Sequence, residues 1–135
     1  MEGRRCLLPI EAAEQSGTFL KLVVDEKSEF IRNNLAPNGG ITDKPSEYNF
    51  YAAPKTAVRW LDEAWWRYLI ARWGYSTAVH SFEFINEGDP FSKSHYDAAN
   101  AMARYFHEYD PSRHLVTTSF WHTYPGAEFW KNPAY

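Results

Sequence analysis

The sequence predicts an α/β protein with a parallel sheet, because segments with helical periodicity alternate with short apolar segments that favour strands. The predicted order along the chain is helix, strand, helix, strand, helix, strand. Helices between successive strands indicate right-handed crossover connections, which place the strands side by side and parallel. In such sheets, functional side chains gather at the carboxyl ends of the strands. The residues that follow each predicted strand are therefore the first candidates for a functional site.

The first half of the chain contains one predicted helix and one predicted strand. Residues 9–16 have the composition of a helix end, and Gly17 is a typical C-terminal stop. Residues 18–24 form a mostly apolar, β-prone run, which predicts a strand buried on both faces. Residues 25–53 follow as a long irregular segment with several Asn, Pro and Gly residues. A connection of this length inside a compact domain is usually functional or mobile.

The middle of the chain predicts a long amphipathic helix and a second strand. The helix is expected to begin at Pro54 or Lys55 and to run to about Trp73, with apolar residues at i, i+3 and i+4 on one face. Gly74 follows as the stop. Residues 79–85 then predict the second strand, because apolar and β-branched residues dominate them.

The last part of the chain predicts a third helix and a third strand. Ser94 is expected to cap the helix, with Asp97 three residues later as an acidic capping box. The helix is predicted to stop at the Asp-Pro-Ser sequence of residues 110–112, and residues 114–119 form the expected third strand. Residues 120–135 are aromatic and contain proline, without a clear period.

Composition excludes several classes of function. At 135 residues the chain is long enough for one domain, and its net charge of −3 argues against nucleic-acid binding. Cys6 is the single cysteine, so an intrachain disulfide is excluded. No apolar run approaches the roughly 18–20 residues of a membrane span. The first residues do not predict a signal peptide, because Pro9 and Glu11 interrupt a short apolar stretch, and the sequence leaves the cellular location open.

The most informative strand end is the dipeptide Asn86-Glu87. Gly88 and Pro90 stop the strand directly after it. A carboxylic acid at the tip of a rigid strand, beside an amide, is a suitable arrangement for a positioned proton donor. Two alternatives remain, since Glu87 could be an ordinary loop or capping carboxylate and Asn86 could serve only the turn.

Aromatic residues follow the third predicted strand, where Trp121, His122 and Tyr124 lie close together in sequence. Aromatic residues make up 18% of the chain, and flat rings suit ligands that combine apolar and hydroxylated faces, as sugars do. These three residues predict a sugar-stacking platform with a hydrogen-bonding imidazole. A packed aromatic turn explains the same pattern, and both interpretations stay open.

The remaining polar residues do not predict a metal site or a cofactor site. The histidines show no metal-ligand spacing with an acidic partner, which concerns His95, His107 and His114. The pair Gly39-Gly40 is not followed by a helix and does not form a phosphate-binding motif. Glu83 lies within the second predicted strand and is expected to be a buried structural carboxylate.

Residues 66–76, Trp-Arg-Tyr-Leu-Ile-Ala-Arg-Trp-Gly-Tyr-Ser, followed by residues 82–87, Phe-Glu-Phe-Ile-Asn-Glu, resemble the third helix and fourth strand of cellulase-like glycoside hydrolases. These enzymes belong to the clan of retaining (β/α)₈-barrel glycosidases. The resemblance implies a partial TIM barrel in which residues 9–135 supply strands three to five. It implies that Glu87 is the general acid/base and that Asn86 binds the sugar 2-hydroxyl. It also implies an oligo- or polysaccharide with β-linkages as the substrate and no cofactor.

The sequence departs from this family in three respects. The family places its nucleophile, a second glutamate, on the seventh strand, beyond the strands predicted here. Retaining hydrolysis needs two carboxyl groups about 5–5.5 Å apart, so this chain alone is expected to hydrolyse little or nothing. The first predicted strand is followed by Asp25-Glu26-Lys27, where many relatives place a histidine. Asp25 is one of the expected substrate-binding residues and the first candidate for a second carboxylate. Residues 1–8 match nothing in the family and are expected to be a leader.

Two alternative functions remain open. The chain could be a non-catalytic carbohydrate-binding or interaction module, or a non-functional truncated gene product. Three parallel strands leave two sheet edges exposed, which favours self-association.

Overall fold

The computed structural model describes residues 7–27, 31–46, 49–121 and 131. It confirms the predicted alternation of helices and strands. The elements are, in chain order, α1 (Leu7–Ser16), β1 (Leu20–Glu26), the 3₁₀ helices η2 (Ile31–Asn34) and η3 (Asn49–Tyr51), α2 (Ala57–Trp73), β2 (Val79–Asn86), α3 (Lys93–Tyr109) and β3 (Leu115–Thr117). Within these residues, no helix combines the length and the apolar character needed to cross a membrane.

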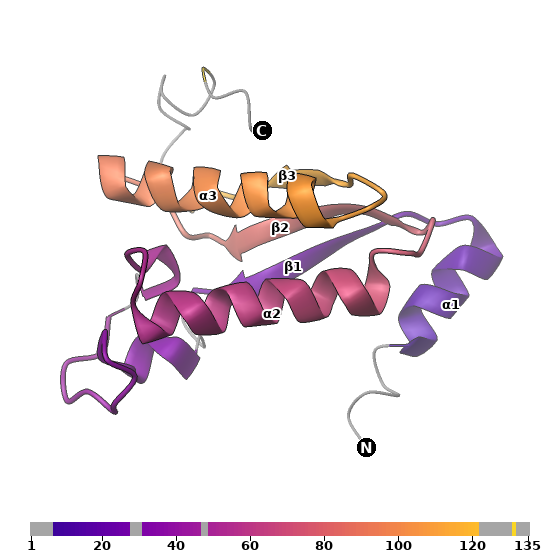
Figure 1. The fold of residues 1–135 in the computed structure, drawn as a ribbon. Coiled ribbons are helices and arrows are strands. Elements are labelled where there is room, and N and C mark those ends of the chain that lie inside the picture. The colour runs from indigo at the N-terminus through magenta and orange to yellow at the C-terminus, as the bar shows by residue number, and fades with distance from the viewer. Residues whose placement is uncertain (1–6, 28–30, 47–48, 122–130, 132–135) are drawn as a thin grey trace.

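The three strands form one parallel sheet in the order β1-β2-β3 (Figure 1). Phe82 in the central strand pairs with Leu22 on one side and with Val116 on the other. Helices α2 and α3 lie side by side on one face of the sheet, and α1 lies near the ends where the strands begin (Figure 1). The fold class is therefore α/β with parallel strands joined by helical crossovers, as predicted.

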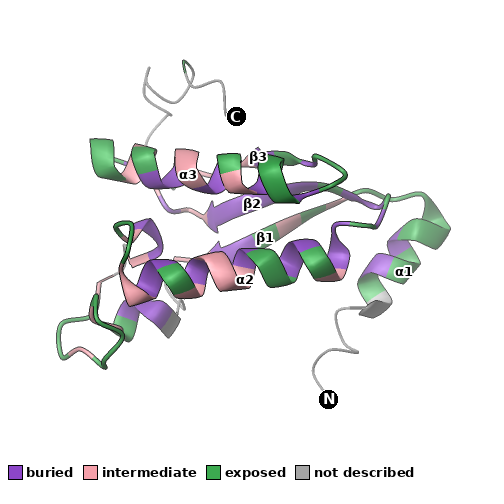
Figure 2. Ribbon diagram, in the orientation of Figure 1, coloured by how far each residue is buried: buried purple, intermediate pink, exposed green. Residues whose placement is uncertain are grey.

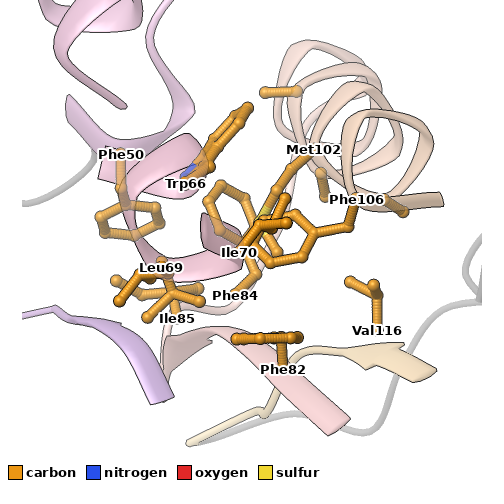
Figure 3. Close-up of a cluster of buried hydrophobic side chains, with 14 of the residues drawn as sticks. Phe50, Trp66, Leu69, Ile70, Phe82, Phe84, Ile85, Met102, Phe106 and Val116 are labelled. Atoms are coloured by element: carbon orange, nitrogen blue, oxygen red, sulfur yellow. The ribbon is translucent and has the colours of Figure 1, made fainter. Parts of the chain in front are cut away.

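The core lies between the sheet and the inner sides of α2 and α3 (Figure 3). Its largest fully buried side chains are aromatic or long and apolar, among them Trp66, Phe82, Phe84, Met102 and Phe106. Buried residues of both long helices face the sheet, and exposed residues lie on their outer sides (Figure 2). The core therefore holds the central strand in place and so fixes the position of its carboxyl end.

Helix α2 begins slightly later than predicted. Thr56 is the N-cap, and its side chain accepts a hydrogen bond from the backbone N–H of Arg59. Lys55 has a φ of 67°, a left-handed conformation that cannot belong to the helix. The predicted end at Trp73 is confirmed, and Gly74 is required there because a Cβ atom would lie 2.6 Å from the carbonyl oxygen of Ile70.

The predicted cap of α3 is wrong by two residues. Ser92 has the extended backbone of an N-cap, and its side chain accepts a hydrogen bond from the N–H of His95. Ser94 instead lies within the first turn. Asp97 forms an exposed ion pair with Lys93 one turn earlier, so the predicted capping box does not form.

Strand β1 differs from the prediction in position and in burial. It spans Leu20–Glu26 rather than residues 18–24, and the side chains of Lys21 and Val23 are exposed. The expectation of two buried faces is wrong because β1 is an edge strand of the sheet and both long helices cover the same face. Strand β3 is shorter than predicted and spans Leu115–Thr117.

Candidate functional site

The carboxyl ends of the three strands bring seven polar or aromatic residues into one region. The parallel register pairs Glu26 at the end of β1 with Asn86 at the end of β2. Residues just after β3 contact residues just after β2. We call this group the strand-end cluster, and it consists of Glu26, Lys27, Asn86, Glu87, Asp89, Ser119 and Trp121.

Asn86 lies at the last position of β2 and is partly buried. Its side-chain amide donates a hydrogen bond to Oε2 of Glu26 over 2.7 Å. The two residues come from strands that pair directly in the sheet. The amide of Asn86 is therefore held by a neighbouring strand rather than by its own turn, which goes beyond the role of an ordinary turn residue.

Glu87 has an unusual backbone conformation for a non-glycine residue. Its φ of 56° lies in the left-handed region, which costs free energy for residues with a Cβ atom. The backbone N–H of Glu87 donates a hydrogen bond to Oγ of Ser119, over 2.8 Å, and its side chain is partly buried. Such strain often occurs at functional sites, where the surrounding structure enforces it. The conformation supports a functional interpretation of Glu87.

The glycine after Glu87 has no room for a side chain. A Cβ atom on Gly88 would lie 2.4 Å from Cγ2 of Ile85 and 3.0 Å from Cζ of Phe50, and both of these residues are fully buried. The carbonyl of Gly88 also accepts a hydrogen bond from the hydroxyl of Tyr51. The turn that presents Glu87 is therefore fixed by the core beneath it.

Trp121 supplies the aromatic surface of the cluster. Its backbone N–H donates a hydrogen bond to the carboxylate of Asp89, and 55% of the residue is exposed. The ammonium group of Lys27 lies 5.8 Å from the centre of the Trp121 ring, within the range of a cation–π contact. The two other predicted residues of this platform, His122 and Tyr124, lie outside the described residues.

Asp25 belongs to a different group of residues from the strand-end cluster. Its Oδ1 accepts a hydrogen bond from Arg32, and Nε of Arg32 lies 3.0 Å from Oδ1 of Asp62 on α2. We call these three residues the buried charge cluster. Burial raises the pKa of Asp25 to about 8 and that of Asp62 to about 7, although Arg32 opposes both shifts. One guanidinium thus serves two carboxyl groups, and burial favours the protonated form of both against the attraction of Arg32.

Four residues of the strand-end cluster escaped the sequence prediction of the site, namely Glu26, Lys27, Asp89 and Ser119. Glu26 was overlooked because the predicted strand ended two residues early, and a strand extended to Glu26 would have shown the pairing with Asn86. Ser119 was assigned to the third strand, and no local pattern connects it with Glu87. The prediction for Glu83 is confirmed as far as burial is concerned, because Glu83 is 1% exposed and pairs with Lys21 of β1.

A cavity of about 780 Å³ opens beside the free edge of β1. The cavity is largely apolar, and Trp65 and Tyr68 of α2 line it. Their rings are stacked, with 5.4 Å between the ring centres. Glu26 and Asp25 also line this cavity, whereas Asn86 and Glu87 do not. The cavity is therefore adjacent to the strand-end cluster but is not centred on Glu87.

Replacing Glu87 by glycine should raise the free energy of unfolding by about 1 kcal/mol, because glycine adopts a positive φ without steric strain. Urea denaturation measures this change. Arg113, exposed and with a φ of 50°, offers a matched control, and Arg113→Gly should stabilise the chain by a similar amount. A clear loss of stability in Glu87→Gly, with a gain in Arg113→Gly, would show that Glu87 makes stabilising contacts that outweigh its strain.

The site has no arrangement that suggests a metal centre. Among the described residues, no group of three or more His, Cys, Asp or Glu side chains is placed to hold a metal ion. The cluster instead offers the carboxyl group of Glu87 on a turn fixed by the core, the amide of Asn86 held by Glu26, and the exposed indole ring of Trp121. Comparisons of the chain with protein-family models, with curated proteins and with solved structures gave no match.

Proposed function

We propose that this chain supplies strands three to five of a retaining (β/α)₈-barrel glycoside hydrolase that acts on β-linked glycans. The observation that supports this proposal is the strained position of Glu87 at the carboxyl end of the central strand, directly after an amide held by Glu26. Parallel strands joined by helices, as in this sheet, are the repeating unit of such barrels. The choice of the glycoside hydrolase family rests on the sequence resemblance of residues 66–76 and 82–87.

In this proposal Glu87 acts as the general acid/base. It protonates the leaving-group oxygen and then, as a carboxylate, activates the water molecule that completes hydrolysis. Asn86 binds the 2-hydroxyl, a contact that strengthens in the oxocarbenium-like transition state. Trp121 offers an exposed ring on which a sugar can stack. The nucleophile would come from a seventh strand, and the chemistry needs no metal or cofactor.

A second candidate function is carbohydrate binding without hydrolysis, and the cavity beside β1 favours it. Trp65 and Tyr68 present a stacked aromatic pair there, and Tyr68 is 46% exposed. This surface lies on α2 and does not depend on Glu87. Self-association through the free edges of β1 and β3 is a further proposal for the partners of the chain, because both edges are unpaired in the described sheet.

Calorimetric titration with a β-1,4-linked glucose hexasaccharide tests the proposed site. We expect the chain to bind the sugar and Trp121→Ala to weaken binding about tenfold, because stacking contacts contribute on the order of 1 kcal/mol. Trp60→Ala is the matched control, since Trp60 is 64% exposed on the outer side of α2 and should not change the affinity. Loss of binding in Tyr68→Ala but not in Trp121→Ala would favour the second candidate.

A hydrolysis assay with an aryl β-glycoside tests whether the chain contains its nucleophile. We expect no turnover above background, because the proposal places the nucleophile on a seventh strand and Glu87 alone cannot complete the two-step reaction. Turnover that disappears in Glu87→Gln would contradict this part of the proposal. The search for a second carboxylate would then include Glu26, which contacts Asn86, as well as Asp25.

A further inference from the structure

The contact between Glu26 and Asn86 selects one orientation of the asparagine amide. A primary amide has a donor end and an acceptor end, and rotation by 180° exchanges them. An ionised carboxylate can only accept hydrogen bonds. Glu26 therefore holds the Nδ2 end of Asn86, over 2.7 Å, and the Oδ1 end must lie on the other side of the amide.

The pairing of β1 with β2 places Glu26 directly beside Asn86. Glu26 and Asn86 are direct partners in the parallel register of β1 and β2, although they lie 60 residues apart in the sequence. Both side chains are partly buried. A hydrogen bond to a charged acceptor is stronger than one between neutral groups, so the amide of Asn86 has one preferred orientation before any ligand arrives.

We infer that Glu26 is a positioning residue, and that it makes Asn86 an acceptor for a hydroxyl group of the ligand. This inference rests on the proposed function, because it assigns the hydroxyl to a sugar. An acceptor fixed in this way selects a glycan whose 2-hydroxyl points at Asn86 and donates its proton. A glycan with the opposite configuration at C2, or with a blocked 2-hydroxyl, cannot make the contact and leaves the Asn86 oxygen unpaired.

The first experiment observes the contact without any sugar. The two side-chain N–H signals of Asn86 are assigned in an NMR spectrum by their loss in Asn86→Asp. In the unsubstituted chain we expect one of them to exchange slowly with solvent, and in Glu26→Ala we expect its protection to fall at least tenfold. Glu26→Gln should retain part of the protection, since the glutamine carbonyl also accepts. Unchanged protection in Glu26→Ala would overturn the inference.

The second experiment measures the consequence for recognition. β-1,4-Linked glucotetraose and mannotetraose differ in the configuration of the 2-hydroxyl, so the ratio of their dissociation constants reports on the contact with Asn86. We expect the unsubstituted chain to prefer one of them, and Glu26→Ala to reduce that preference at least fivefold. Trp121→Ala is the control, because it should weaken both sugars and leave the ratio unchanged.

The two experiments distinguish a failure of the proposed function from a failure of the inferred role of Glu26. If the unsubstituted chain binds neither tetrasaccharide, the proposed function is wrong, and the NMR result still decides whether Glu26 positions Asn86. If it binds them without preference, or if the preference survives in Glu26→Ala, the inferred role in recognition is wrong. A loss of folding in Glu26→Ala would appear in the whole NMR spectrum, in which case Glu26→Gln provides the comparison.

Discussion

Replacing Trp66 by alanine should lower the free energy of unfolding by about 3–5 kcal/mol, the range found for large-to-small changes at fully buried aromatic positions. Trp66 is completely buried between α2, α3 and the sheet (Figure 3). The centre of its ring lies 5.9 Å from that of Phe84 and 5.6 Å from that of Tyr105. The substitution removes these contacts and leaves a cavity at the centre of the core. Urea denaturation monitored by circular dichroism measures the change.

Two control variants separate packing from other effects of this substitution. Trp60 lies in the same helix and is 64% exposed, so Trp60→Ala should change stability by less than about 0.5 kcal/mol. Trp66→Phe keeps most of the ring and removes an indole N–H that has no hydrogen-bond partner among the described residues. It should therefore cost much less than Trp66→Ala. Equal effects of the three variants would contradict the central position of Trp66 in the core.

Raising the pH from about 5 to about 8 should destabilise the protein, because Asp25 and Asp62 bind protons more tightly when the chain is folded. Burial raises the pKa of these carboxyl groups to about 8 and about 7, compared with 3.8 without burial. In this range the folded chain holds more protons than the unfolded chain, so the free energy of unfolding falls as the pH rises. Each pKa unit corresponds to about 1.4 kcal/mol, so the two raised pKa values together lower the free energy of unfolding by several kcal/mol as the pH rises to 8.

Asp62→Asn tests the origin of this pH dependence. It leaves one carboxylate for Arg32, so we expect higher stability at pH 8 and a shallower slope between pH 5 and 8. Burial lowers the pKa of His95 and so contributes in the opposite sense, and the difference between the unsubstituted chain and Asp62→Asn removes this contribution. Asp97→Asn is the control, because Asp97 belongs to an exposed ion pair. A slope that Asp62→Asn leaves unchanged would show that the buried charge cluster is not its cause.

The order of helices and strands was predictable from the sequence, because elements with a buried side carry apolar residues at regular intervals along the chain. The apolar period predicted the helix that ends at Trp73, but its buried side is rotated from the predicted one. Leu69 is in the core as expected, whereas Tyr68 is 46% exposed and the predicted polar residue Asp62 is buried. The start of a helix was less predictable where two residues of the same type could both serve as its N-cap. Ser92 and Ser94 have identical side chains, and only the extended backbone of Ser92 decides which one caps α3.

The site was only partly predictable because its contacts depend on register. Asn86 and Glu87 were found from their place after an apolar strand. Glu26 was missed because a shift of two residues in β1 changes which side chain lies beside Asn86. Arg32 lies in a segment without periodicity and Asp62 lies on α2, far from Asp25 in the sequence, so no local pattern connects either residue with Asp25.

The parallel sheet has a consequence for how the strand-end cluster forms during folding. Its hydrogen bonds join residues that are far apart in the chain, 60 residues for Asn86 with Glu26 and 32 residues for Glu87 with Ser119. Contacts of such high sequence separation require that large loops close first, which slows their formation. The cluster is thus expected to assemble late, and its amide contact reports on the completed fold rather than on any single element.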